Sequence, residues 1–542
     1  MLHLTYEFVK GLDMLSTSST TLDSNRSIIH SAARFFSGTM LSRVTGMLRD
    51  ICMAYAFGTQ SGIAALLVAF RFAHLLRRLL GEGAMQTALI PHFEELRKDD
   101  PHRAGNFFCD LTVTLTQLLA FIIVIVMGIL WGCLQWGNLD SGNAEIVWLT
   151  FLMMPSLLFI CLFGINASLM QCEKSFFISS AAPVAFNLFW TIGIFASAHL
   201  PSQQAMTVLS LFIIAACFAQ WSATLPKVYD ILNTLNIKSL WKGVSYSSDV
   251  LRLAKPLALG IIGIGASQIN NALDAIFARW ADPEGPAILW YAIRLQQLPL
   301  ALFGIAIANA LLPPLARAGK NNDTVQFTRF LNFSVNRTMA VMLPMTAGLL
   351  LLGDACIQLV YGHGDFTLTS VVSTTLALWG YTIGLFPMAM VLILAPAFYA
   401  KGNYRTPSMA AVSAMILNTI LNGVMIAFLG LGAASVAIAT SISSWVNFFW
   451  LGQQLNQDMP WVNQSLLAYG GKVLLATAVA SFATVCCHEW LWSSFPAWDI
   501  LRGTPPVYAS SLGHQIGVLL LDGSVFLSVL VGFGYLLRLQ RH

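Results

Sequence analysis

Long apolar segments alternate with short polar ones along the whole chain. A helix needs about 20 mostly apolar residues to cross a bilayer, and fourteen segments reach that length. The predicted spans are 29–57, 62–92, 107–135, 146–171, 176–199, 204–225, 250–276, 286–316, 330–352, 372–399, 407–429, 431–453, 468–489 and 514–537. The pattern therefore predicts an all-α polytopic membrane protein with fourteen transmembrane helices.

Basic residues gather in every second connecting segment. The opposite set of segments holds only Arg279 and Arg502. The rich set contains Lys10, Arg26, Arg97, Lys98, Arg103, Lys174, Lys227, Lys238, Lys242, Arg317, Lys320, Arg329, Lys401, Arg405, Arg538 and Arg541. Because basic loops stay in the cytoplasm, both termini are expected to be cytoplasmic. This orientation requires an even number of spans, as the count gives.

The second and eighth predicted spans carry a similar pattern. Arg71 precedes ALIP at 88–91, and Arg294 precedes ALLP at 310–313, at an offset of 222–223 residues. An even number of spans separates them, so the repeat is parallel. We expect a tail (1–28), two pseudo-symmetric six-helix lobes (29–228 and 229–456) and two extra C-terminal helices (457–542). Paired repeats of this kind are typical of alternating access.

Composition places the chain among membrane proteins. Of its 542 residues, 56% are hydrophobic and 10% are charged, against about 25% charged in soluble domains. A net charge of +4 gives no indication of a nucleic-acid partner. The nine cysteines are scattered without a CxxC pair and are expected to be free thiols. No P-loop, HExxH or G-x-S-x-G motif is present, so a transporter is favoured over an enzyme.

The segment from Ser42 to Pro91 is apolar yet unusually charged. If these side chains faced lipid, the cost would be about 15–25 kcal/mol, so they are expected to face water, each other or an anion. On an ideal helix, Arg71, His74, Arg78 and Glu82 share one face, and Arg78 would pair with Glu82. The charged side chains are Arg43, Arg49, Asp50, Arg71, Arg77, Arg78 and Glu82.

The positive surplus in this segment favours an anionic ligand. Arg294, deep in the eighth span, has no acidic residue three or four positions away. Guanidinium groups suit phosphate because they are planar, always charged and donate hydrogen bonds in pairs. The arginines therefore predict a site for a pyrophosphate or a polyanionic head group. The alternative is that they bridge helices through backbone carbonyls or extend to the membrane interface.

A second polar group lies in the seventh and eleventh predicted spans. Asp274 is accompanied by Asn270 and Asn271, and Asn418 and Asn422 are one helical turn apart. Carboxylate and amide oxygens together are able to coordinate a monovalent cation, and Asp274, Asn418 and Asn422 are a candidate sodium site. Hydrogen bonding between helices by asparagine is the alternative.

Four segments resemble the MurJ/MviN family of lipid II flippases, in the multidrug/oligosaccharidyl-lipid/polysaccharide exporter superfamily. They are SRVTGMLRD (42–50), VAFRFAHLLRRLLGEGA (68–84), WYAIRLQQLPLALFGIAIANALLP (290–313) and AKGNYRTP (400–407). The resemblance implies a V-shaped pair of lobes around a cationic cavity, with a groove for the lipid tail in the last two helices. Its functional arginines fall on Arg43, Arg49, Arg77 and Arg294, and Arg78 and Glu82 are their motif neighbours.

The chain departs from the family pattern at four positions. Ala64 and Ile293 stand where acidic residues are common, His74 replaces an asparagine, and Asn422 replaces the second acid of the sodium site in some relatives. The first two changes would leave the cavity more positive. Sodium coupling is therefore an open expectation, and no cofactor is required for the predicted function.

The predicted function is transfer of lipid II, an undecaprenyl-pyrophosphate-linked disaccharide-pentapeptide, from the inner to the outer leaflet of the bacterial inner membrane. The expected partners are lipid II, membrane lipid and proteins of peptidoglycan synthesis or division, with no nucleic acid. Two alternatives stay open at this point: a flippase for another polyprenyl-linked saccharide and a non-transporting cell-wall scaffold. A cation-coupled drug exporter would have acidic rather than arginine-rich cavity residues, so the sequence argues against it.

Overall fold

The computed structural model describes residues 22–237, 240–321, 323–492, 495–508, 511–537 and 539, and within them every regular element is a helix. The first half contains α2 (Leu22–Phe57), α3 (Ser61–Ala73), the π-helical turn η1 (Arg77–Gly81), α4 (Ala84–Asp99), α5 (Pro101–Trp136), α6 (Ser141–Met153), α7 (Ser156–Cys172), α8 (Phe176–Ala181), α9 (Pro183–Ser197), α10 (Ser202–Ser222) and α11 (Leu225–Thr234). The predicted tail lies outside the described residues up to position 21.

The second half begins with the short turn η2 (Leu240–Lys242). It continues with α12 (Ser248–Arg252), α13 (Ala254–Ala281), α14 (Gly285–Pro299), the π-helical turn η3 (Leu300–Gly304), α15 (Ile305–Lys320), α16 (Thr324–Tyr361), α17 (Leu368–Ile383), α18 (Leu385–Ala400), α19 (Arg405–Leu429), α20 (Ala434–Asp458), α21 (Gln464–Trp492), α22 (Pro496–Leu501) and α23 (Leu512–Leu536). Helices suit these apolar stretches because each satisfies its own backbone hydrogen bonds in lipid.

Side-chain caps fix where several of these helices begin. Asp140 accepts a hydrogen bond at the start of α6, Asp323 does so at the start of α16, and Thr367 does so at the start of α17. Such caps satisfy backbone N–H groups that have no partner within the first turn. All three lie in polar connections between apolar segments, so the apolar runs and the capping residues together set the element boundaries.

Nine helices within the described residues are long and apolar enough to cross a membrane, and the pair α6–α7, bent by 48°, would make a tenth. The all-helical membrane class is thereby confirmed. The four predicted spans that do not appear among these ten are 29–57, 62–92, 250–276 and 286–316. Three of them carry the arginines described above, and the fourth carries Asp274.

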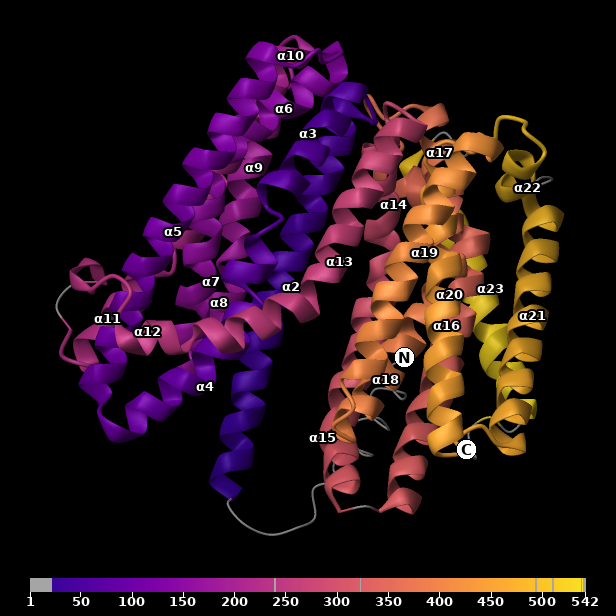
Figure 1. Cartoon of the computed structure of the whole chain (residues 1–542). Helices are drawn as coiled ribbons and strands as arrows, with labels where there is room; N and C mark the ends of the chain where they lie inside the picture. Colours follow the sequence, from indigo (N-terminus) through magenta and orange to yellow (C-terminus); the bar gives the residue numbers. More distant parts are fainter. Residues whose placement is uncertain are drawn as a thin grey trace.

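The helices of the two halves gather on opposite sides of the molecule (Figure 1). The group from α2 to α11 forms one bundle, the helices from α14 to α20 form another, and α21 and α23 lie at the outer edge of the second. Helix α13 packs against α3 and α4 of the first half and against α19 of the second. The arginine-bearing helices α2, α3 and α14 therefore lie where the two halves meet.

The predicted second span is not one continuous helix. Helix α3 ends at Ala73, η1 follows, and α4 begins after Gly83, whose φ of +64° suits glycine. The eighth predicted span is interrupted in the same way by η3 between α14 and α15. The two π-helical turns begin at Arg77 and Leu300, 223 residues apart, which agrees with the offset of the sequence repeat.

Candidate functional site

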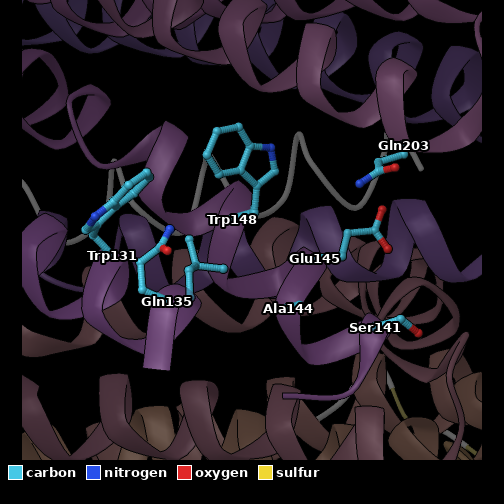
Figure 2. A pocket seen from close by; sticks show the side chains of 8 residues that line it. Trp131, Gln135, Ser141, Ala144, Glu145, Trp148 and Gln203 are labelled. Atoms are coloured by element: carbon cyan, nitrogen blue, oxygen red, sulfur yellow. The ribbon is translucent and has the colours of Figure 1, made fainter. Parts of the chain in front are cut away.

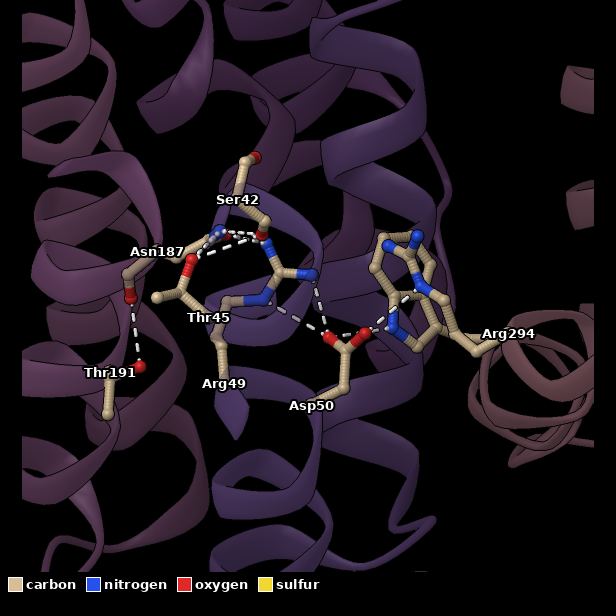
Figure 3. A network of polar contacts seen from close by, with 8 residues as sticks. Ser42, Thr45, Arg49, Asp50, Asn187, Thr191 and Arg294 are labelled. Carbon is tan, nitrogen blue, oxygen red and sulfur yellow. Dashed lines mark hydrogen bonds and ion pairs between the residues drawn. The ribbon is translucent and has the colours of Figure 1, made fainter. Parts of the chain in front are cut away.

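Asp50 lies at the centre of a charged network that joins the two halves (Figure 3). Its Oδ1 accepts hydrogen bonds from Arg49 Nη2 at 2.7 Å and Nε at 3.1 Å, both on α2. Its Oδ2 lies 3.0 Å from Nε of Arg294 on α14, in an ion pair whose N–H is not aligned as a hydrogen bond. Two guanidinium groups thus share one carboxylate, and the network carries a net positive charge.

Arg49 is held from a second side by α9. Its Nη1 donates to Asn187 Oδ1 at 3.0 Å, and the Asn187 amide in turn donates to Thr45 Oγ1 at 3.0 Å. The Arg49 guanidinium also lies 4.5 Å from the ring centre of Trp190, within the range of a cation–π contact. With 6% of its side chain exposed, Arg49 is a fixed element of the site.

Arg294 is more accessible than Arg49. Its side chain is 38% exposed, and its guanidinium lies 4.5 Å from the ring centre of Trp290 on the same helix. Trp290 also donates a long hydrogen bond of 3.4 Å to Asp50. The absence of a local acid around Arg294, noted in the sequence, is compensated by Asp50 from the other half of the chain.

The predicted pairing of Arg78 with Glu82 is wrong. Arg77 Nη2 donates to Glu82 Oε1 at 2.9 Å instead, while Arg78 is exposed. The prediction assumed 100° of rotation per residue through position 82, but α3 ends at Ala73 and η1 has a wider turn. The shared face expected for Arg71, His74, Arg78 and Glu82 is lost for the same reason.

Gly81 allows the interruption between α3 and α4 to pack closely against α7. A methyl group at Gly164 on α7 would lie 2.0 Å from the Gly81 carbonyl oxygen, and one at Gly81 would lie 2.9 Å from the Cys161 Cα. Real Cβ atoms do not approach backbone this closely. The two glycines therefore allow η1 to pack directly against α7, and this packing places Arg77 and Glu82 beside each other.

Arg71 extends from α3 toward α13. Its Nη1 donates to the carbonyl oxygen of Asn271 at 3.3 Å, and it lies within electrostatic range of Asp274 and Arg294. Arg43 is exposed on α2, and neither it nor Arg78 forms an ion pair in the described part of the chain. The structure thus groups Arg49, Arg294 and Arg71 between the halves and places Arg77 with Glu82 at the break.

The polar residues of the candidate cation site meet between α13 and α19. Asp274 Oδ1 accepts from Asn418 Nδ2 at 2.7 Å and from Asn422 Nδ2 at 2.9 Å, while Asn270 Nδ2 donates to Oδ2 at 3.1 Å. All but Asn270 are buried, and the side-chain oxygens of Asn418 and Asn422 have no hydrogen-bond partner in the part of the chain that the structure describes. Two unpartnered amide oxygens beside a buried carboxylate fit a monovalent cation.

A further set of contacts, not predicted from the sequence, joins the halves at one end. Thr59, 2% exposed, donates to Glu284 Oε2 and lies 2.8 Å from Ser370 Oγ. Nearby, Gln60 donates to Asp365 Oδ2 at 3.3 Å, and the Asp365 N–H donates to the carbonyl of Tyr55 at 3.0 Å. Glu284 and Asp365 belong to the polar turns 282–286 and 361–367, whose charges were the only sequence signal for this contact.

A cavity of about 490 Å³ lies apart from the arginines, at the ends of α5, α6 and α10 (Figure 2). Its lining includes Trp131, Trp148, Gln135, Gln203 and Glu145. It contains none of the predicted site residues. The arginine network and this cavity are therefore separate features of the first half.

The fold is shared with solved transporters. A structure described as "Lipid II flippase MurJ, inward closed conformation" matches 93% of this chain and 99% of that chain, with a TM-score of 0.73 and 21% identity. An "inward-facing conformation of a multidrug resistance MATE family transporter of the MOP superfamily" matches 79% of this chain and 98% of that one, with a TM-score of 0.61 and 12% identity. At these identities the likeness shows the fold alone, an all-helical polytopic membrane fold that solved transporters share.

Sequence comparison identifies the family. The model described as "Lipid II flippase MurJ" matches residues 53–500. A "probable lipid II flippase MurJ" of Chlamydia muridarum (strain MoPn / Nigg) is 32% identical over 527 residues, covering 96% of each chain. A "lipid II flippase MurJ" of Burkholderia cenocepacia is 27% identical over 451 residues, covering 81% of this chain and 87% of the relative. The chain belongs to the MurJ lipid II flippase family.

Proposed function

We propose that this protein is a lipid II flippase of the inner membrane, a transporter rather than an enzyme. The observation that carries the proposal is the network in which Arg49 and Arg294, from the two halves, share the single carboxylate of Asp50. A site with two guanidinium groups and one acid suits a diphosphate, because the anion supplies the negative charge that the protein lacks. Arg71 adds a third cation within electrostatic range.

The residues of the site have different tasks. Arg49 is fixed by hydrogen bonds to Asp50 and Asn187 and orients the phosphate. Arg294 is partly exposed and exchanges Asp50 for a phosphate oxygen when the lipid head group enters. Arg43 and Arg78 are exposed cations along the same segment, and Arg77 is held by Glu82. All of them keep positive potential around the head group, while the polyprenyl tail stays in lipid.

The contacts of Thr59 with Glu284 and Ser370 support alternating access. The distribution of basic residues predicts that the turns 282–286 and 361–367 face the outside of the membrane. In that orientation, these contacts close the outer end of the molecule. The proposal includes fourteen spans, two six-helix lobes (29–228 and 229–456) and cytoplasmic termini. The segment 457–542 is proposed to form the groove for the lipid tail.

The α13–α19 polar group is proposed to bind sodium. Asp274 would supply a carboxylate oxygen, and Asn418 and Asn422 would supply amide oxygens that have no hydrogen-bond partner among the described residues. A bound cation would neutralise a buried carboxylate and hold α13 against α19. Proteins of peptidoglycan synthesis or division are proposed partners on grounds of function alone.

Complementation in a bacterium depleted of its own lipid II flippase tests the function. Outer-leaflet lipid II is measured directly for wild type, Arg294→Ala and Arg294→Lys at matched membrane levels. We expect wild type to restore lipid II exposure, Arg294→Ala to fail, and Arg294→Lys to restore it weakly because lysine does not donate in pairs. Arg252→Ala, which removes an exposed arginine at the end of α12, is the matched control.

Two results would contradict the proposal. Failure of a well-expressed wild type in this assay would favour a flippase for another polyprenyl-linked saccharide. Full activity of Arg294→Ala would keep the flippase and remove the shared-carboxylate site from its mechanism.

A further inference from the structure

A group of ionisable side chains lies buried in the C-terminal part of the molecule, away from the arginine network. His488 Nδ1 on α21 lies 2.7 Å from Asp522 Oδ2 on α23, and the two side chains are 6% and 3% exposed. Asp354 on α16 is 2% exposed and lies within electrostatic range of His488. Helix α16 packs against both α21 and α23, so the three residues sit where the extra helix pair joins the rest of the chain.

The acceptors in this cluster outnumber the donors. Asp522 Oδ1 and Asp354 Oδ2 are buried and have no hydrogen-bond partner in the described part of the chain. The hydroxyl of Tyr508 lies close enough to Asp354 to interact with its carboxylate, although the two groups do not form a well-aligned hydrogen bond. Among the described residues, the ion pairs of this region comprise only His488 with Asp522, and Asp354 has no cation of its own. Buried polar groups left in this condition are rare in folded proteins.

Counting charges shows what the cluster lacks. With both carboxyl groups ionised and a neutral imidazole the cluster would carry two negative charges in apolar surroundings that include Phe495, whose ring centre lies 4.9 Å from that of His488. One proton converts His488 and Asp522 into a neutral ion pair. A second proton, on Asp354, makes the whole cluster neutral and supplies an O–H donor. Ionisable residues at membrane depth are functional candidates for this reason.

We propose that Asp354, His488 and Asp522 form a proton-binding site that ties the packing of α21 and α23 on α16 to pH. The bond formed on binding is an O–H bond at the Asp354 carboxyl; the proton comes from a hydronium ion of the solvent, which becomes water. Release of that proton leaves a buried negative charge at the junction, so water enters and the helix pair loosens. The site concerns the extra helix pair and does not rest on the nature of the transported lipid.

Other titratable groups near the junction leave this assignment in place. Glu489 and His514 are exposed and Asp499 is half-buried, so their charge is screened by solvent, and Tyr508 carries no charge below about pH 10. Those that face the junction from the packed elements are Glu489 on α21, Asp499 on α22, Tyr508 before α23 and His514 on α23. Metal binding is not supported, because the described residues contain no group of three or more His, Cys, Asp and Glu side chains able to hold an ion.

Two measurements on the purified full chain test the proposal. Hydrogen exchange of peptides from α21 and α23, corrected for intrinsic exchange, is followed from about pH 5 to about pH 9. We expect exchange in wild type to become faster by about tenfold above the pH at which Asp354 loses its proton. Infrared spectra over the same range are expected to show loss of a protonated carboxylic acid band with the same midpoint.

Asp354→Asn mimics the protonated acid and is the decisive variant. We expect it to keep α21 and α23 protected at every pH and to lack the part of the carboxylic acid band that titrates with the exchange. Glu489→Gln, which removes an exposed carboxylate from α21, is expected to behave as wild type. The proposal is overturned if wild-type exchange in these helices shows no pH transition, or if Asp354→Asn retains both the transition and the band.

Discussion

The contact between Thr59 and Glu284 gives a quantitative prediction about the closed end of the molecule. Glu284 accepts a hydrogen bond from Thr59, which is 2% exposed and whose hydroxyl also lies 2.8 Å from that of Ser370. A hydrogen bond to a charged group contributes about 1.5–3 kcal/mol, and a neutral one about 0.5–1.5 kcal/mol. Glu284→Gln keeps the shape and loses the charge, so we expect it to weaken the closed end by about 1–1.5 kcal/mol.

That free energy corresponds to a shift of about five- to tenfold in the ratio of closed to open molecules. Spin labels at Leu200 and Leu368, which are 38% and 41% exposed, report the separation of the two halves at this end in a cysteine-free background. We expect a single short distance in the parent protein and an added longer component in Glu284→Gln. Glu489→Gln serves as the control, since that carboxylate is exposed on α21. A distance distribution unchanged by Glu284→Gln would refute the role of this contact.

Three further predictions follow from individual contacts. Gly164→Ala would place a methyl group 2.0 Å from a backbone oxygen of η1 and should lower the free energy of unfolding by about 1–3 kcal/mol. The matched variant Gly128→Ala should leave the melting temperature unchanged or raise it, because its added methyl group would meet no described atom within 4 Å beyond its own helix backbone. Hydrogen bonds from Arg103 lower the pKa of Asp249. Helix α12 should therefore stay docked on α5 at a pH above the ordinary aspartate pKa of about 3.9 and be released as the pH falls below that value. Hydrogen exchange of α12 in wild type and Arg103→Gln checks this prediction, and equal exchange in both would contradict it. Asn422→Asp adds a second carboxylate between α13 and α19. In thermal melts, sodium should then raise the melting temperature of the variant more than potassium does, and by a larger margin than in wild type. No such gain is expected if no cation binds between these helices.

Much of the fold follows from periodicity alone. Ten of the fourteen predicted spans correspond to helices, or to one bent pair, able to cross a membrane. The repeat found from Arg71 and Arg294 reappears as two π-helical turns at the same offset. Apolar length and the spacing of a rare charged residue are properties of the sequence itself, and they survive folding because lipid penalises any other arrangement.

The site could be predicted only as a set of residue types. The sequence shows that Arg49 and Arg294 need a counter-charge, but Asp50 and Arg294 are 244 positions apart, and no local pattern brings α2 against α14. The pairing of Arg77 with Glu82 depends on a π-helical turn that needs glycines on two helices. Glu284 and Asp365 lie in segments whose composition predicts a turn but does not identify the residues of the other half that the turn contacts. Each failure concerns a partner chosen by tertiary packing.

The shared carboxylate suggests how binding and conformational change are coupled. Asp50 is held from α2 by Arg49, whose side chain is 6% exposed, and reaches across to Arg294, whose side chain is 38% exposed. Under the proposed function, an entering diphosphate would compete first for Arg294, because that guanidinium is more exposed than that of Arg49 and its ion pair with Asp50 is poorly aligned. Binding of the phosphate by Arg294 would then break the ion pair between α2 and α14, while Arg49 would keep its hydrogen bonds to Asp50 and Asn187. The anion would thus replace a contact that joins the two halves. It would therefore bind with different affinity to the molecule with this contact formed and with it broken, and an alternating-access transporter requires such a difference in affinity between its conformations.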